Sequence, residues 1–325
     1  SVMLPPMAIF FPMFTFLEEL GYLPRAAFNM DHYFSRSGSC GKQALTMLMG
    51  LGCNAAAIVG CRIIDSPRER LIAILTNAFV PCNGRFPALI AVISMFFTYS
   101  AFASGALAGA VMLTALLIVS VAATLLCGRL LSRTLLKGEQ SSFTLELPPF
   151  RMPRIGRLIV RSVVDRTLFV LGRAAAVAAP AGLLLYALSN ISIGGQSILA
   201  AAVDFLDPFA RIFGLDGAIL IAFMLGFPAN EIVLPIAIMA YTASGSLEEL
   251  PALCDMRALL IANGWSIKTA VCFVLFSVMH WPCSTTLLTI KKETGSLKWT
   301  ILAFLLPTLF GLAACFIVNA VFTLL

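Results

Sequence analysis

The chain consists of long apolar runs separated by short polar stretches. Four of these runs carry no charged residue, at residues 43–61, 86–127, 174–203 and 299–325. A helix that crosses a lipid bilayer needs roughly 20 mostly apolar residues. Because every backbone polar group in lipid must find its partner within the protein, helices are the favoured way for such runs to cross. The pattern therefore predicts an all-α fold, a polytopic bundle of transmembrane helices.

Composition excludes the other broad classes of protein. Of the 325 residues, 60% are hydrophobic and only 12% are charged, whereas an average soluble domain has about 25% charged residues. This balance excludes a water-soluble globular domain and a disordered chain. The nine cysteines are an odd number, form no C-x-x-C pair and lie mostly inside apolar runs, which excludes a secreted fold held by disulfides.

The charges are unevenly placed along the chain. The formal net charge is +6, and basic residues outnumber acidic ones most clearly between residues 129 and 166. In a membrane protein such a loop is typical of the cytoplasmic side, so nucleic acid is not expected as a partner. The pattern predicts a first membrane repeat at residues 1–127, a basic cytoplasmic linker at 128–166, and a second repeat with a C-terminal transmembrane helix at 167–325.

The two membrane halves resemble each other at short interruptions of their apolar runs. Residues 49–54 and 225–230 both combine a helix-breaking glycine or proline with an asparagine. Residues 79–82 and 280–283 both end in a proline–cysteine pair. Interrupted hydrophobic segments at corresponding positions of two halves are a sequence sign of the midplane binding site of a transporter. We therefore expect two repeats that contain broken helices.

The side chains at these interruptions could bind a metal ion. Thiolates and imidazole favour iron, copper or zinc, whereas carboxylates and carbonyls favour magnesium, calcium or manganese. A mixed set suits a borderline ion such as Fe(II), although the spacing alone predicts only a cation transporter and leaves close packing of small residues and buried cysteines open. The predicted metal ligands are Cys53, Asn54, Cys82, Asn230, Glu231 and Cys283.

Isolated charges inside apolar runs are the next candidates. Glu231 is the only charge between residues 217 and 247, so it could bind a cation, relay a proton or neutralise an arginine. Arg85 could pair with Glu231, Glu18 or Glu19, or it could lie at the membrane surface with its charge in water. Glu18 and Glu19 could attract a cation near an entrance of the ion path.

His280 lies beside the second proline–cysteine pair. It is a possible ligand, although a single histidine in an apolar run is more often structural. The chain has no Gly-x-x-x-x-Gly-Lys-Ser/Thr, no Gly-x-Ser-x-Gly and no His-Glu-x-x-His motif. We therefore expect a transporter rather than an enzyme.

At these motifs the sequence resembles FeoB-type ferrous iron transporters along nearly its whole length. The resemblance implies two gate repeats that form an iron path, with Cys53, Cys82 and Cys283 as the cysteine ligands. Where the family has Val-Pro after Cys-Asn, this chain has Ala55-Ala56, which favours a looser first helix break. The similar segments, in chain order, are residues 17–25, 50–58, 81–87, 145–153, 226–233, 282–283 and 291–299.

The resemblance also implies an N-terminal G-protein domain that binds GTP. The chain starts at Ser1 without that domain, so we expect it on a missing N-terminal portion or on another polypeptide. The expected function is uptake of Fe(II), as a transported ion with no permanently bound cofactor, in a bacterial cytoplasmic membrane. Expected partners are the lipid bilayer, the G-protein domain, FeoA-like or FeoC-like accessory proteins and further copies of the chain.

Three alternatives remain open at the level of sequence. Gate-type repeats also occur in carriers of other solutes, so the cargo could be another divalent metal or a nucleoside. The chain could instead be a non-transporting membrane scaffold of the gate type, or a fragment without activity. Transport assays with metals and nucleosides separate the first alternative from iron uptake, and the absence of any flux would indicate one of the other two.

Overall fold

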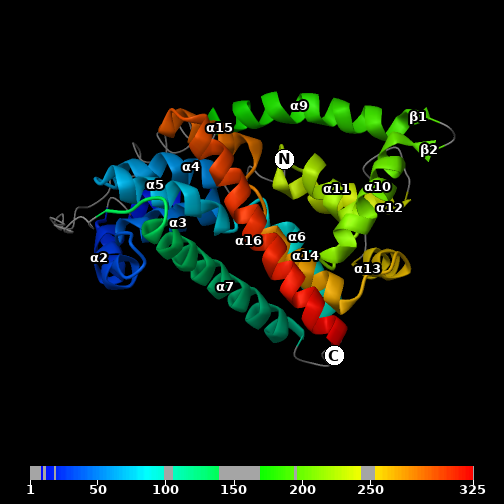
Figure 1. Cartoon of the computed structure of the whole chain (residues 1–325), viewed down its shortest axis with the longest axis horizontal. Helices are drawn as coiled ribbons and strands as arrows, with labels where there is room; N and C mark the ends of the chain where they lie inside the picture. Colours follow the sequence, from blue (N-terminus) through cyan, green and yellow to red (C-terminus); the bar gives the residue numbers. More distant parts are fainter. Residues whose placement is uncertain are drawn as a thin grey trace. The chain divides into compact units, whose positions relative to one another are not determined.

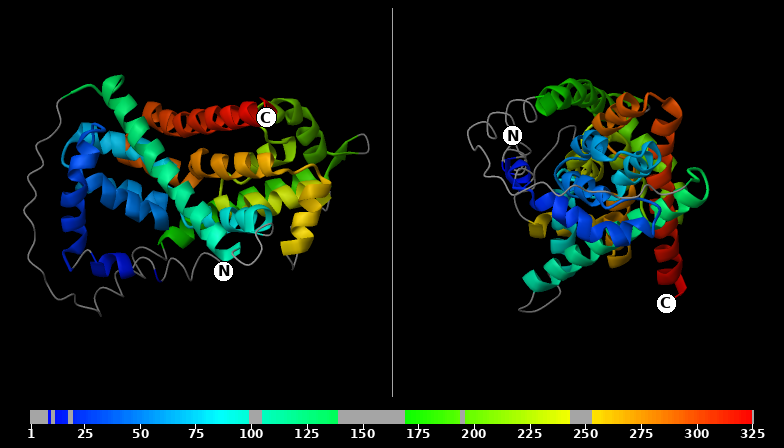
Figure 2. Two further views of the ribbon diagram at one scale, coloured as in Figure 1. Left: turned by 90° about the horizontal axis from the view of Figure 1, so that it is seen from below. Right: turned by 90° about the vertical axis from the view of Figure 1, so that its left-hand side faces the viewer.

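The structure, a computed structural model, confirms the all-α fold. It describes residues 9, 12–17, 20–98, 105–138, 169–193, 196–242 and 253–324. The predicted entrance residues Glu18 and Glu19 and most of the predicted basic linker lie outside the described residues. Figure 1 shows the helices in sequence colours, and Figure 2 shows the same ribbon from two further directions.

The chain divides into two compact units, and each takes segments from both halves of the sequence. Unit 1 comprises Ser1–Asn83, Val119–Ala175 and Thr285–Pro307. Its shorter elements are α2 (Tyr22–Ser35), α3 (Lys42–Gly52), α4 (Asn54–Gly60), η1 (Cys61–Ile63), α5 (Pro67–Thr76) and η2 (Asn77–Phe79), with α15 (Ser284–Thr294) beginning at its boundary. A buried apolar cluster packs α2 and α3 together through Phe34 and Met47, with Val80 beside them.

Unit 2 comprises Gly84–Ile118, Ala176–Ser284 and Thr308–Leu325. Three long helices contribute residues to both units, namely α7 (Gly105–Arg133), α9 (Phe169–Asn190) and α16 (Leu297–Leu324). The predicted boundaries of the two repeats stay a prediction. The shorter elements of unit 2 are α6 (Phe86–Ile93), the π-helical η3 (Ser94–Thr98), α10 (Ile198–Ile212), α11 (Gly217–Leu225), η5 (Asn230–Ile232), α12 (Val233–Thr242), α13 (Leu253–Ala262), α14 (Ile267–Met279) and the two-residue strands β1 (Ser192–Ile193) and β2 (Gln196–Ser197).

Several helices are long and apolar enough to cross a bilayer. Within the described residues these are Leu107–Arg133 in α7, Ile267–Thr294, which comprises α14 and α15, and Leu297–Leu324, which is α16. The pair α10 and α11, bent by 108° at a short break, adds a fourth if it counts as one span. Large apolar side chains along α7 and α16 are exposed, which is unfavourable in water and suits contact with lipid. The chain is a multi-pass membrane protein.

One helix–turn–helix arrangement occurs in both units. The side chain of Asp31 accepts a hydrogen bond from the backbone N–H of Gly41 at 2.6 Å, between α2 and α3. The side chain of Asp207 accepts one from the N–H of Gly217 at 3.1 Å, between α10 and α11. A Cβ atom on either glycine would lie 2.2 Å from a carbonyl oxygen of the preceding helix. The recurrence of this contact supports the internal repeat that the sequence predicts.

Gly217 lies so close to the backbone of α10 that we expect a larger residue there to lower stability. A Gly217→Ala substitution would place its methyl group 2.2 Å from the carbonyl oxygen of Val203, so α10 and α11 would have to move apart. We expect a loss of about 1–3 kcal/mol in the free energy of unfolding, measured as a lower melting temperature in detergent. Gly182→Ala in α9 is the matched control because a Cβ there meets no atom within 4 Å. Equal melting temperatures for the two variants would contradict the prediction.

Candidate functional site

The first predicted helix break is present in unit 1. Helix α3 ends at Gly52 and α4 begins at Asn54, and only Cys53 lies between them, in an extended conformation with φ −153° and ψ 119°. Cys53 is partly exposed, whereas Asn54 is buried. The break forms although this chain has Ala55-Ala56 where the resembling family has Val-Pro, and the expectation of a looser break stays a prediction.

The second break, in unit 2, has the same local form. Helix α11 ends at Leu225 and η5 begins at Asn230. The residue before the asparagine, Ala229, is extended with φ −150° and ψ 116°, close to the angles of Cys53 in unit 1. Asn230 is buried. Each break therefore presents one buried asparagine directly after an extended residue.

Each proline–cysteine pair is held against the break of its own unit. In unit 1, the N–H of Asn83 donates a hydrogen bond to the carbonyl oxygen of Gly52 at 3.4 Å. In unit 2, the N–H of Ser284 donates to the carbonyl oxygen of Phe227 at 3.0 Å. The donor in both cases directly follows the cysteine of the pair. In each unit the structure thus brings together a helix break and a proline–cysteine pair, which the sequence had matched only with their counterparts in the other half.

The predicted metal ligands fall into two groups, one in each unit. Unit 1 holds Cys53, Asn54 and Cys82, and unit 2 holds Asn230, Glu231 and Cys283. Within the described residues, no three His, Cys, Asp or Glu side chains gather closely enough to hold a metal ion. An ion bound in either unit would therefore also depend on amide or backbone oxygens. The ligand set stays a prediction.

Glu231 carries an uncompensated polar atom beside the second break. Its Oε2 atom is buried and has no hydrogen-bond partner among the described residues. The ion pairs found in the described part of the chain join Lys42 with Asp65, Arg62 with Glu293, and Arg211 with Asp207. A carboxylate oxygen left in this state is suited to accept a cation or a proton.

Arg85 has a role that the sequence did not indicate. The expectation of a surface position is wrong, because only 2% of the residue is exposed. Its Nη1 atom donates to the carbonyl oxygen of Val278 at 2.8 Å, and Nη2 donates to those of His280 and Trp281, both at 3.2 Å. These carbonyls lie at the end of α14, where a helix carries partial negative charge. Arg85 therefore caps the helix that precedes the second proline–cysteine pair.

His280 has polar contacts at both of its ring nitrogens. It is buried, and its Nδ1 atom lies 2.9 Å from the carbonyl oxygen of Ser277 and 3.2 Å from that of Phe276. Its Nε2 atom lies 3.4 Å from Oδ1 of Asn230. Both ring nitrogens thus face groups of unit 2, which agrees with the structural interpretation that the sequence favoured.

Asn77 was not among the candidates from the sequence, yet it lies at the first break. It is buried in η2, and its Nδ2 atom donates to Oδ1 of Asn54 at 3.3 Å. The available signal was a single amide side chain in the short apolar run that ends at Pro81. That signal is weak, because a buried asparagine can serve packing alone.

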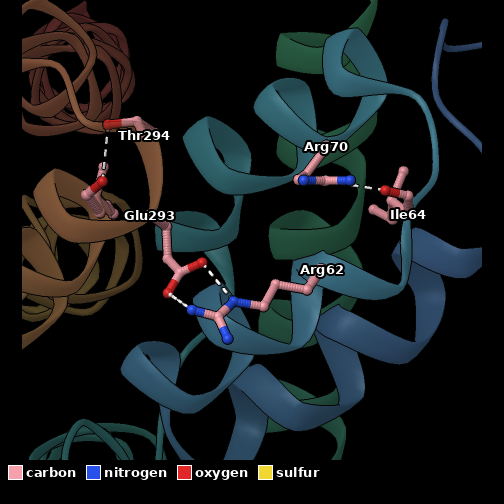
Figure 3. A network of polar contacts seen from close by, with 6 residues as sticks. Arg62, Ile64, Arg70, Glu293 and Thr294 are labelled. Carbon is pink, nitrogen blue, oxygen red and sulfur yellow. Dashed lines mark hydrogen bonds and ion pairs between the residues drawn. The ribbon is translucent and has the colours of Figure 1, made fainter.

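A polar network in unit 1 involves the C-terminal motif of the resembling family. The guanidinium of Arg62 donates from Nε and Nη2 to the two carboxylate oxygens of Glu293, both at 2.7 Å (Figure 3). Nearby, Nε of Arg70 donates to the carbonyl oxygen of Ile64 at 3.0 Å. This paired geometry connects the end of α15 with η1 inside unit 1.

Two family models match the chain. The Gate family, described as "Nucleoside recognition", matches residues 1–97 and 171–297. The family described as "Ferrous iron transport protein B C terminus" matches residues 113–165. No solved structure matches the chain. The two family matches together confirm the resemblance to the membrane region of FeoB-type proteins.

Similar curated proteins carry one printed name, Fe(2+) transporter FeoB. The protein of Leptospira interrogans serovar copenhageni is 26% identical over an alignment of 348 residues. The alignment covers 99% of this chain and 49% of that protein. The protein of Staphylococcus aureus strain MSSA476 is 27% identical over 97% of this chain and 46% of its own length. The protein of Salmonella typhimurium strain LT2 is 29% identical over 76% and 32%. The chain spans about half the length, or less, of these relatives.

Proposed function

This chain belongs to the Gate family, and we propose that it forms the membrane path of an Fe(II) uptake permease of the FeoB type. The observation that carries the proposal is the repeated geometry, in which the residue after a proline–cysteine pair donates a backbone hydrogen bond to a helix break in each unit. Similarity to proteins named Fe(2+) transporter FeoB supports ferrous iron as the cargo.

The donors at the two breaks suit this cargo. Cys53 and Cys82 supply sulfur in unit 1, and Cys283 supplies sulfur beside Asn230 and Glu231 in unit 2. Asn54 stays a predicted oxygen ligand. Mixed sulfur and oxygen donors suit Fe(II), and several weak sites let an ion leave as readily as it enters.

The wider setting is part of the same proposal. Rocking of the two gate repeats would alternate access to the ion. We place the protein in a bacterial cytoplasmic membrane, as a transporter without enzymatic activity of its own and without a permanently bound cofactor. A GTP-binding G-protein domain, fused or separate, and FeoA-like or FeoC-like proteins are the proposed partners, and Glu18 and Glu19 are the proposed entrance charges. Association into homo-oligomers stays a prediction.

A nucleoside is the second candidate cargo, because the matching family is described as "Nucleoside recognition". The test uses the full chain in proteoliposomes with Fe(II), Mn(II), Zn(II), Co(II) or nucleosides outside. An imposed concentration gradient drives flux, so no energy source is needed. We expect Fe(II) to accumulate faster than the other metals and nucleosides not at all. Nucleoside accumulation, or no flux from a correctly inserted chain, would contradict the proposal, and the latter result would favour a scaffold.

A further inference from the structure

Helix α7 changes from an apolar to a cationic surface where its apolar span ends. That span ends at Arg133. In its last turns Leu126 and Leu130 are exposed, and Arg129 and Arg133 are exposed beside them. Because residues three or four positions apart lie on one face of a helix, these four side chains share a face. That face offers apolar groups to lipid and then two positive charges at the edge of the membrane.

Two further arginines come from segments of unit 1 that pack against this end of α7. A Cβ atom on Gly38 would overlap the side chain of Ser132, so the turn after α2 touches α7 directly. Arg36 is exposed two residues before that glycine. Arg68 of α5 donates from Nε to the carbonyl oxygen of Leu136 at 2.5 Å, and from Nη1 to that of Gly38 at 3.5 Å. These contacts hold three segments together around a group of exposed arginines.

The acidic side chains of unit 1, as far as the structure describes them, are engaged elsewhere or buried. One accepts a backbone hydrogen bond, two form ion pairs with Lys42 or Arg62, and one is buried. In that order they are Asp31, Asp65, Glu293 and Glu69. The ion pairs of the described residues include none of the exposed arginines at this end of α7. Their positive charge is therefore available to an anion from outside the chain.

We propose that Arg36, Arg129 and Arg133 bind the headgroup of an anionic phospholipid whose acyl chains lie on the exposed leucines of α7. Guanidinium groups match phosphate oxygens with paired hydrogen bonds. Basic sites beside membrane helices on the cytoplasmic side suit such headgroups, and the basic loop after α7 is predicted to lie on that side. A lipid is favoured over a soluble anion because it alone would use both the apolar and the cationic side chains of this face.

Arginines at the end of a helix also have a simpler use. Cations stabilise the negative end of a helix dipole, and long side chains reach from an apolar surface into water. Arg68 already donates to a carbonyl just beyond α7, so the end of this helix has a cation without the other three arginines. The two uses make different predictions. The dipole is stabilised in any detergent, whereas the proposed site responds only to anionic lipid.

The experiment measures the melting temperature of the purified full chain in neutral detergent without iron. Phosphatidylglycerol, phosphatidylcholine and soluble glycerol phosphate are added to separate samples, and the phosphatidylglycerol is titrated. We expect a saturable rise of about 2–6 °C with phosphatidylglycerol over phosphatidylcholine and no rise with glycerol phosphate. The absence of a rise specific to the anionic lipid overturns the proposal. An equal rise with glycerol phosphate also overturns it, in favour of a site for free phosphate.

Two double variants assign the rise to this end of α7. Arg129→Gln with Arg133→Gln is expected to raise the lipid concentration at the midpoint of the titration by more than about tenfold. Lys291→Gln with Lys292→Gln removes two exposed charges near the end of α15 and should leave the midpoint unchanged. A midpoint that the arginine variant leaves unchanged, or that both variants shift equally, overturns the proposal.

The melting temperature without lipid is the folding control. Both double variants should then melt like the unchanged chain, because the four altered side chains are exposed. If the arginine variant melts early, Arg36→Gln tests the site from another segment, and an unchanged midpoint in that variant overturns the proposal. The inference goes beyond the proposed function and is independent of it. Failure of iron uptake leaves the lipid response intact, and a missing lipid response leaves the iron path in place.

Discussion

An Arg85→Met variant is expected to lower the free energy of unfolding by about 3–5 kcal/mol, because it leaves buried carbonyls without their donor. The guanidinium donates to three main-chain carbonyls at the end of α14. Methionine keeps much of the apolar volume but supplies neither the charge nor the hydrogen bonds. We expect a fall of about 10 °C in the melting temperature of the full chain in detergent.

Two controls make this result specific to the cap. Arg133→Met removes the same charge from an exposed position near the end of α7 and should change the melting temperature little. Arg85→Lys keeps the charge but cannot reach three carbonyls with a planar group, so it should fall between the two. An Arg85→Met variant that melts like the unchanged chain would show that the end of α14 does not depend on this cap.

A Cys53→Ser, Cys82→Ser double variant is expected to reduce Fe(II) uptake in proteoliposomes by more than about tenfold while its fold remains intact. Serine has nearly the size of cysteine but offers Fe(II) a poor hydroxyl ligand in place of sulfur. The backbone contact between Asn83 and Gly52 that holds the two segments together does not involve either side chain. The measurement is the initial rate of iron entry under an imposed gradient.

Cys254→Ser is the matched control for the sulfur ligands. Cys254 is exposed on α13 and lies at neither break, so its loss should leave the uptake rate unchanged. An unchanged melting temperature of the double variant is needed to attribute lost uptake to the ligands. Uptake at the normal rate by the folded double variant would remove sulfur from the proposed iron path.

Part of the candidate site could be predicted because helix breaks are local. Glycine and proline weaken a helix locally, and where they end it the residues that follow become available for binding. Cys53 and Asn230 were therefore found from runs of a few residues. Pro180, Pro208 and Pro307, by contrast, lie inside helices. The same reasoning could not reveal Asn77, because its significance comes from Asn54, which lies on another segment.

Arg85 is a residue whose structural role the sequence did not reveal. The sequence suggested an ion pair with Glu231, Glu18 or Glu19, or a surface position, whereas three of its partners are backbone carbonyls 193 to 196 residues away. Every residue type carries the same carbonyl group, so such partners leave no pattern in a sequence. The cap could be recognised only when the end of α14 was seen beside Arg85 within unit 2.

The sequence by itself determined that this protein is a bundle of membrane helices and where those helices break, because hydrophobicity, glycine and proline act over a few neighbouring residues. Only the tertiary structure decided which groups meet at the breaks. It hydrogen-bonded the residue after each proline–cysteine pair to a helix break, buried Arg85 on main-chain carbonyls and placed Asn77 beside Asn54. These contacts join segments far apart in the chain, and they arise from packing rather than from any local preference.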